Sequence, residues 1–311
     1  MQFLLAVEGA VAQGLLWAIL ALGSYITFRL LNFTDMTVDG SFTTGACVTA
    51  ICIANGIPPI IALLISFVAG GLAGGITGFL HNKLEIPEVL AGILTQISLY
   101  SINLRILGRA NQQLLQYDTI FKQVQRLFAS IGLELSSDRI AIVIGLFFVI
   151  LVILVLYWFF GTEIGSMIRA TGNNEAMVRA LGQNTEHTKF IALIIANSCI
   201  AIAGSLVGMY QGAADVGMGA GAIVIGLASI VIGEVILRRV VAFGSKMIAV
   251  VVGSVIYRII VALVLQLGLS TNDLKLITAL IVALALFLPN AVSKHNAKKA
   301  RELAAKESQN A

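Results

Sequence analysis

Nine apolar stretches, each about as long as a membrane-spanning helix, constrain this chain more than any other feature. An apolar helix of roughly 20 residues crosses the core of a bilayer. The stretches that reach this length, give or take a few residues at each end, are about 10–31, 38–55, 59–81, 86–107, 138–160, 189–211, 217–237, 245–267 and 273–290. Only 12% of the 311 residues are Asp, Glu, Lys or Arg, about half the charged share of a soluble domain. We therefore predict an all-α, polytopic bundle of about nine transmembrane helices, with eight to ten as the range.

The second stretch differs from the others because it is short and rich in Gly, Ser and Thr. The polar run NFTDMTVDGS, residues 32–41, precedes and enters it. Lipid offers no hydrogen-bond partners to irregular backbone, so such a run is tolerated at membrane depth only when protein surrounds it. We predict a broken or re-entrant helix here.

The distribution of Lys and Arg predicts the orientation. With the N-terminus outside, thirteen of these residues fall in inner loops and the C-terminal tail, and six fall in outer loops. Cytoplasmic loops of membrane proteins carry the excess of cations. We expect an external N-terminus and an internal C-terminus, with one transmembrane domain over 1–293 and a basic cytoplasmic tail over 294–311. The first residues lack the positive start of a signal peptide and are expected to stay in the mature chain.

Glycines repeat at helical spacing in two of the stretches. The series are Gly70, Gly71, Gly74, Gly75 and Gly78 in the third stretch, and Gly204, Gly208 and Gly212 in the sixth. Small residues at this spacing let helix backbones approach closely in a membrane. They predict a tight multi-helix bundle.

One outer loop is long. Residues 108–137 mix charged and apolar positions at a spacing typical of an amphipathic helix on the outer surface. Such a helix would either rest on lipid or dock a partner, and the sequence favours neither.

Catalytic and metal-binding patterns are missing. The sequence contains no GxxxxGK[ST] and no HExxH, so we expect neither ATP hydrolysis nor a cofactor on this chain. Cys47, Cys52 and Cys199 lie in apolar surroundings without a CxxC pattern, which indicates packing and no metal site. The cations lie in loops, which excludes a nucleic-acid partner. We predict a non-catalytic membrane protein.

A polar segment over 161–188 interrupts the apolar helices on the cation-rich side. Asn173 or Asn174 suits a helix start, with Glu175 in the first turn, and Gly182 suits a helix stop. Two turns of helix cannot span a membrane, but they can fill a shallow groove on another protein. The apolar face for this contact consists of Met177, Val178 and Leu181. The alternative is an ordinary inner loop with some helix.

This segment, GTEIGSMIRATGNNEAMVRALGQNT, resembles the cytoplasmic coupling segment of ABC importer permeases, most of all the branched-chain amino acid and ribose group. The matching positions are Gly165, Arg169, Ala170, Gly172, Asn174, Arg179, Ala180, Leu181, Gly182 and Asn184. The N-terminal run GLLWAILALGSYITFRLLNFTDMTVDG also resembles the first span of that group and the break that follows it. Because the two matches lie far apart and in the expected order, the resemblance covers most of the chain.

The region of the seventh and eighth stretches departs from that group, which is nearly uncharged there. Here it carries Glu234, Arg238, Arg239 and Arg258 and continues into NDLKLITAL. This run resembles a narrower branch whose members work with binding proteins of the tryptophan and tyrosine type.

The resemblance implies a permease subunit in the plasma membrane of a prokaryote. Its implied partners are a second permease copy, ABC ATPase subunits that bind ATP-Mg, and an extracytoplasmic substrate-binding protein. The implied solute is an aromatic amino acid. The residues expected to couple to the ATPase are Gly165, Arg169, Gly172, Asn174, Glu175, Met177, Val178, Arg179, Leu181 and Gly182. The alternatives are import of branched-chain amino acids or another small solute of the group, or an ion-coupled secondary carrier. A carrier should show two halves with matching interrupted helices and buried acids, and the sequence shows only one such helix.

Two charged residues fall within apolar stretches. Intramembrane charge is expensive and often functional. Glu234 could pair with Arg238 one turn later, or it could join Arg258 to hold a gate or a subunit contact. Polar residues that could line a solute path are Thr43, Thr44, Thr95, Gln96, Asn103 and Asn197. Each of these could equally satisfy a hydrogen bond between helices.

Overall fold

The computed structural model describes residues 2–237 and 242–266, together with the single positions 276, 279, 280, 283 and 287. Helix α1 (Gln2–Tyr25) continues into a π-helical turn, η1 (Ile26–Leu30). The other apolar helices are α2 (Val38–Ala54), α3 (Pro59–Lys83), α4 (Glu88–Leu107), α6 (Ser137–Gly161), α9 (Thr185–Gln211), α10 (Ala222–Ile236) and α11 (Phe243–Gln266).

Six helices in the described part of the chain are long and apolar enough to cross a membrane. They are the segment Ala6–Leu30, α3, α4, α6, α9 and α11, whereas α2 and α10 are shorter. Eight of the nine predicted stretches thus correspond to a helix. The ninth, 273–290, and the tail, 294–311, lie outside the described ranges, so the number nine stays a prediction. The helical, polytopic fold class is confirmed.

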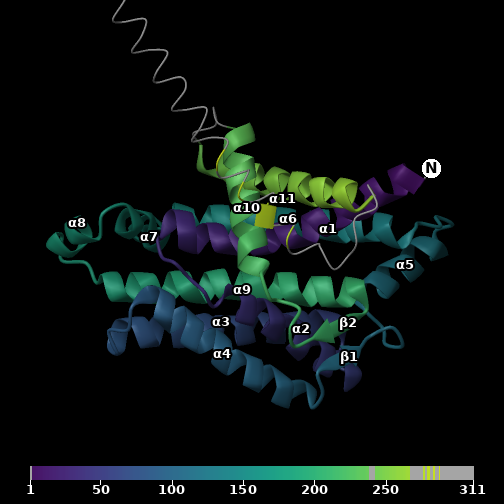
Figure 1. Cartoon of the computed structure of the whole chain (residues 1–311), viewed down its shortest axis with the longest axis horizontal. Helices are drawn as coiled ribbons and strands as arrows, with labels where there is room; N and C mark the ends of the chain where they lie inside the picture. The colour runs from purple at the N-terminus through teal and green to yellow at the C-terminus, as the bar shows by residue number, and fades with distance from the viewer. Residues whose placement is uncertain are drawn as a thin grey trace, which may run out of the picture.

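The two ends of the bundle differ. The N-terminus lies at the same end as α5 (Ile120–Ser130) and the short antiparallel pair β1 (Asn111–Gln113) and β2 (Ala213–Asp215) (Figure 1). Helices α7 (Glu163–Asn173) and α8 (Glu175–Ala180) lie at the opposite end. This arrangement agrees with the one that the cation count predicts, although which end faces the cytoplasm remains a prediction.

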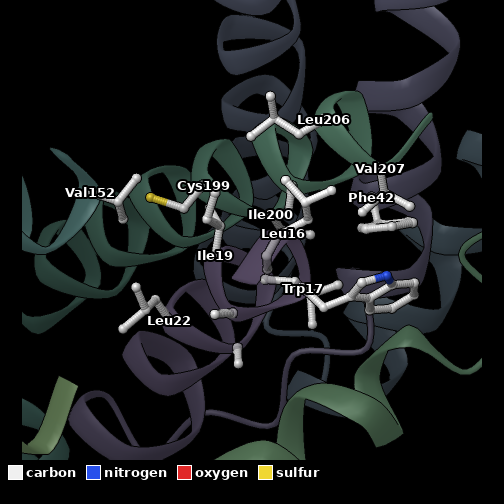
Figure 2. Close-up of a cluster of buried hydrophobic side chains, with 14 of the residues drawn as sticks. Leu16, Trp17, Ile19, Leu22, Phe42, Val152, Cys199, Ile200, Leu206 and Val207 are labelled. Atoms are coloured by element: carbon white, nitrogen blue, oxygen red, sulfur yellow. The ribbon is translucent and has the colours of Figure 1, made fainter. Parts of the chain in front are cut away.

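Helix α9 forms the centre of the bundle, between α3 on one side and α1 on the other (Figure 1). A Cβ at Gly74 would overlap the Leu193 carbonyl oxygen, and one at Gly204 would overlap the Phe42 carbonyl oxygen. The glycine series therefore let α9 contact α3 and α2 backbone to backbone, which confirms the predicted tight packing. Figure 2 shows the apolar core where α1, α2 and α9 meet, and in it the Trp17 ring of α1 packs on the Phe42 ring of α2 with centroids 4.8 Å apart.

Helix α2 is enclosed by protein: 14 of its 17 residues are buried. Residues 31–37, which precede it, leave the helical conformation, and Asn32 adopts a positive φ of 55°. We call residues 31–37 the break. The Asp35 carboxylate accepts hydrogen bonds from the Thr37 backbone N–H at 2.8 Å and from Nδ2 of Asn197 at 2.8 Å. The predicted broken helix is confirmed, and buried side chains supply the partners that lipid could not.

The outer loop contains the predicted amphipathic helix, α5. Ile120 and Phe121 of its first turn are buried against the bundle, whereas Leu127 is exposed. Whether lipid or a partner covers the exposed side stays a prediction.

Candidate functional site

The polar segment over 161–188 folds as two short helices, α7 and α8, with start and stop signals close to those predicted. The side chain of Asn174 accepts a hydrogen bond from the Met177 backbone N–H at 3.0 Å and so caps α8. Gly182 follows the helix with a φ of 78°, a left-handed conformation that favours glycine. Of the two predicted candidates, Asn173 and Asn174, the structure thus has Asn174 as the cap of α8.

The apolar face of α8 is smaller than predicted. Met177 is 48% exposed and Leu181 is 70% exposed, but Val178 is only 3% exposed. Val178 therefore packs against its own chain and is not available to a partner, so its place in the predicted face is wrong. The sequence shows which side chains of the helix are apolar. It cannot show whether each one packs against its own bundle or faces a partner.

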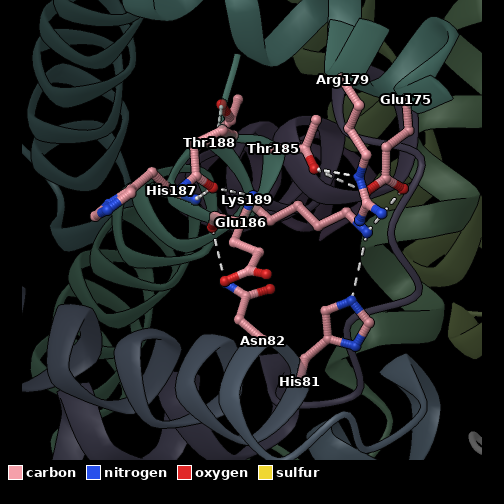
Figure 3. A network of polar contacts seen from close by, with 10 residues as sticks. His81, Asn82, Glu175, Arg179, Thr185, Glu186, His187, Thr188 and Lys189 are labelled. Carbon is pink, nitrogen blue, oxygen red and sulfur yellow. Dashed lines mark hydrogen bonds and ion pairs between the residues drawn. The ribbon is translucent and has the colours of Figure 1, made fainter. Parts of the chain in front are cut away.

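Glu175 is the centre of a polar network between α8 and α9 (Figure 3). Its carboxylate lies 2.7 Å from Nη2 of Arg179 and 3.0 Å from Nζ of Lys189, and it accepts a hydrogen bond from the Thr185 hydroxyl at 3.0 Å. Partial burial acts to raise the pKa of the Glu175 carboxyl. The hydrogen bonds and positive charges of Lys189, Thr185 and Arg179 outweigh burial and hold this pKa below its ordinary value.

The network continues from α9 into the break. Nζ of Lys189 lies 3.4 Å from Nε2 of His81 at the end of α3, and Nδ1 of His81 lies 2.9 Å from the Ile86 carbonyl oxygen. The His81 ring meets the buried Phe33 ring edge-on, with centroids 5.1 Å apart. Phe33 belongs to the break, so a series of side-chain contacts joins α8 to the break.

Helix α7 makes a second, direct contact with the same region. A Cβ at Gly172 would overlap the Leu30 carbonyl oxygen at the end of η1. Arg169 lies over the Phe243 ring at 5.4 Å, at the start of α11. Helix α7 therefore contacts both η1 and the start of α11.

A cavity of about 510 Å³ lies between α2, α4 and the loop that leads into α10. Its lining residues are Asp39, Gly40, Thr43, Gln96, Ile97, Tyr100, Ser101, Asn103, Val216, Gly217 and Ala220. Three of the six predicted path residues, Thr43, Gln96 and Asn103, thus line one cavity. We call it the central cavity.

Two of the other three predicted path residues, Thr95 and Asn197, form hydrogen bonds between elements, and the third, Thr44, bonds within its own helix. The Thr44 hydroxyl donates to the Gly40 carbonyl at 2.9 Å, Thr95 bonds to Thr77 at 2.9 Å, and Asn197 bonds to Asp35 and Ser41. None of the three lines the central cavity. For Thr95 and Asn197 the structure supports the alternative of hydrogen bonds between helices, whereas Thr44 bonds only within α2.

Asp39 joins the starts of the two short helices α2 and α10. Its two carboxylate oxygens accept the backbone N–H groups of Gly221 at 2.9 Å and Ile223 at 2.8 Å. The helix dipole favours a negative charge at this end of α10. Sequence reasoning did not select Asp39, although the run 32–41 contained it.

The charged residues of the spans are arranged differently from the prediction. Glu234 pairs with Arg29 of η1, whereas Arg258 lies over the Trp17 ring at 4.2 Å and donates to the Gln13 side chain at 3.2 Å. A pair between Glu234 and Arg258 is therefore wrong, because α10 brings Glu234 to η1 and α11 brings Arg258 to the first half of α1. Arg238 lies outside the described residues.

The family model and the three relatives compared below are all described as transport permeases. A family model described as branched-chain amino acid transport system / permease component matches residues 6–288. A tyrosine transport system permease protein of Clostridioides difficile is 38% identical over 289 residues, which cover 92% of this chain and 93% of the relative. A probable branched-chain amino acid transport permease protein of Methanocaldococcus jannaschii is 28% identical over 212 residues, 66% of each chain. A ribose import permease protein of Haemophilus influenzae is 25% identical over 192 residues, 61% of this chain and 56% of the relative. No solved structure gives a significant match.

Proposed function

Because the chain belongs to the family of branched-chain amino acid transport system permease components, we propose that it is the transmembrane subunit of an ATP-driven importer of an aromatic amino acid, tyrosine or tryptophan. The importer lies in the cytoplasmic membrane of a prokaryote. Two ATPase subunits carry ATP-Mg, and an extracytoplasmic binding protein delivers the solute.

The observation that carries this proposal is the connection between α8 and the break. Met177 and Leu181 present exposed apolar side chains to a partner, while Glu175 on the same short helix joins Lys189, His81 and, through His81, Phe33. In the proposed importer, the ATPase subunits would push α8, and these contacts would pass the displacement to the break that precedes α2. Switching between discrete packings of this bundle would open the cavity to one side of the membrane and then to the other.

The nature of the solute rests on two observations. The relative with 38% identity carries the name of a tyrosine transport permease. The charged run around Glu234 and Arg258 resembles the tryptophan and tyrosine branch. Branched-chain amino acids and other small solutes of the family remain the alternatives.

A homodimer is supported by the surroundings of the central cavity. Ile97 and Tyr100 at its rim are exposed, and the Asp39 carboxylate is only half-buried. A half-buried carboxylate is costly to leave against lipid. In the assembled importer, the second copy would cover this face and enclose the path.

One observation favours a second candidate, an ion-coupled carrier. Helix α10 is short, like α2, and the starts of these two short helices meet at Asp39. A carrier would work without nucleotide, so the two candidates differ in whether uptake requires ATP.

Reconstitution tests the proposal. The chain is placed in proteoliposomes with its ATPase and binding-protein partners, and uptake of labelled tyrosine and tryptophan is followed. Uptake should require ATP together with both partners, and it should persist when ion gradients are collapsed by ionophores. Uptake by the chain alone, driven by an ion gradient, would establish the carrier instead.

A further inference from the structure

Asn103 of α4 is a buried side chain whose amide has no hydrogen-bond partner. It is 1% exposed, and neither its oxygen nor its nitrogen makes a hydrogen bond to any residue that the structure describes. Leaving such a group unpaired is costly, and an unpaired group in a native fold calls for a reason. Asn103 lines the central cavity. Its two amide atoms are covered here, but no described residue holds them by a hydrogen bond, so a rotation of the side chain would present the amide to a molecule that enters the cavity.

Asn197 provides the comparison within the same fold. It is equally buried, but its amide nitrogen donates to Asp35 at 2.8 Å and to the Leu193 carbonyl at 3.0 Å, and its oxygen accepts from Ser41 at 2.6 Å. An amide that only holds helices together is thus fully paired here. The amide of Asn103 has no such partners among the described residues, so bonding between helices does not explain its position.

The same cavity contains a carboxylate without a cation. Asp39 accepts two backbone N–H groups, and a carboxylate has about four lone-pair positions. The cavity lining includes no Lys, Arg or His, and Asp39 belongs to none of the ion pairs formed by the described residues. Asp39 can therefore still accept hydrogen bonds from an ammonium group.

The rest of the lining is mainly apolar. Ile97 and Tyr100 of α4 lie on one side, and Val216 lies on the loop before α10. A volume of about 510 Å³ falls within the usual range for sites of small molecules, about 300–1,000 Å³. The side chain of an aromatic amino acid has the size and polarity to occupy this apolar part.

We infer that Asp39 and Asn103 hold the two charged ends of the transported amino acid, the α-ammonium group at Asp39 and the α-carboxylate at the amide nitrogen of Asn103. The inference rests on the proposed function, and it specifies which residues of the solute path bind the amino acid. A simple cation would be served by Asp39 alone and would leave the donor group of Asn103 unpaired. A zwitterion uses both groups.

The complete importer in proteoliposomes tests this with the variant Asn103→Leu. Leu is close to Asn in size and removes both unpaired polar atoms, so the melting temperature of the complex should stay the same or rise. Uptake of tyrosine or tryptophan should fall at least tenfold, while ATP hydrolysis without the binding protein is unchanged. The control is Ser98→Ala on the same helix, since Ser98 is exposed, bonds to its own helix and lies outside the cavity lining.

Unchanged uptake in Asn103→Leu would overturn the inference. If the wild-type importer moves no amino acid at all, the proposed function fails. If the wild type imports and Asn103→Leu imports equally well, only the site at Asp39 and Asn103 fails.

A binding experiment separates the two charged ends. The detergent-solubilised importer, without binding protein, is heated with tyrosine, tyramine or 3-(4-hydroxyphenyl)propionate. Tyrosine should raise the melting temperature most, because it alone carries both groups. If tyramine raises the melting temperature as much as tyrosine does, Asn103 does not bind the carboxylate. If the propionate raises it as much, Asp39 does not bind the ammonium group. If tyrosine does not raise it, both roles are overturned.

Discussion

Glu175 of α8 lies 3.0 Å from Lys189 of α9, and the same lysine ammonium lies 3.4 Å from His81 of α3 (Figure 3). Lys189 is largely buried, with 12% of its side chain exposed. It therefore depends on these two partners for its polar contacts. These contacts join α8, which lies at one end of the bundle, to two of its long helices.

The variant Glu175→Gln should weaken this connection. Glutamine keeps a similar shape but cannot balance the charge of Lys189, and losing one member of a partly buried pair is more costly than losing an exposed one. We expect a melting temperature lower by a few degrees and several-fold more ATP hydrolysed per solute imported. Both are measured on the reconstituted importer. Glu163→Gln is the control, because Glu163 is exposed in the first turn of α7; an equal loss in this control would contradict a specific role for Glu175.

The stability supplied by Glu175 should depend on pH with a definite sign. The folded-state pKa of Glu175 is lowered from its ordinary value of 4.5. A group of this kind stabilises the fold fully above its unfolded pKa and loses its contribution as the pH falls through the lower folded pKa. The melting-temperature difference between wild type and Glu175→Gln should therefore be constant near neutral pH and shrink below about pH 4.5. A difference that grows on acidification would contradict the lowered pKa.

Local patterns predicted those parts of the fold that depend on neighbouring residues. Glycine spacing predicted close helix packing, and Gly74 does contact the backbone of α9. Asn174 and Gly182 marked the limits of α8. The polar run 32–41 predicted the break, because unpaired backbone cannot lie in lipid whatever the rest of the fold.

Contacts between distant segments could not be predicted in this way. Arg29 and Glu234 are 205 positions apart, and no spacing rule relates them before the helices are placed. Lys189 counted in the sequence only as one more inner cation, although the fold places it between Glu175 and His81. Asp39 was overlooked because its partners are backbone groups at the start of α10, a helix whose starting residue only the structure reveals.

The contact between α7 and η1 should be sensitive to a single methyl group. In Gly172→Ala the new Cβ would overlap the Leu30 carbonyl oxygen, and overpacking of this kind costs about 1–3 kcal/mol. We expect lower thermal stability and reduced uptake, because α7 must move away from the end of α1. Gly161→Ala is the matched control, since its Cβ would meet no atom within 4 Å. Equal stability of the two variants would show that α7 does not rest on η1.

The exposed apolar side chains of α8 should bind the ATPase without contributing to the fold. In the double variant Met177→Asp and Leu181→Asp, both side chains are exposed in the chain alone, so the melting temperature of the isolated permease should change little. Two carboxylates would be too costly to bury in an apolar groove, so co-purification with the ATPase and ATP-driven uptake should be lost. Leu127→Asp is the control, because Leu127 is similarly exposed, at 61%, on α5 at the opposite end of the bundle. Val178→Asp should instead unfold the region around α8, since Val178 is buried. An ATPase that stays bound to the double variant would show that another surface of the permease carries the contact.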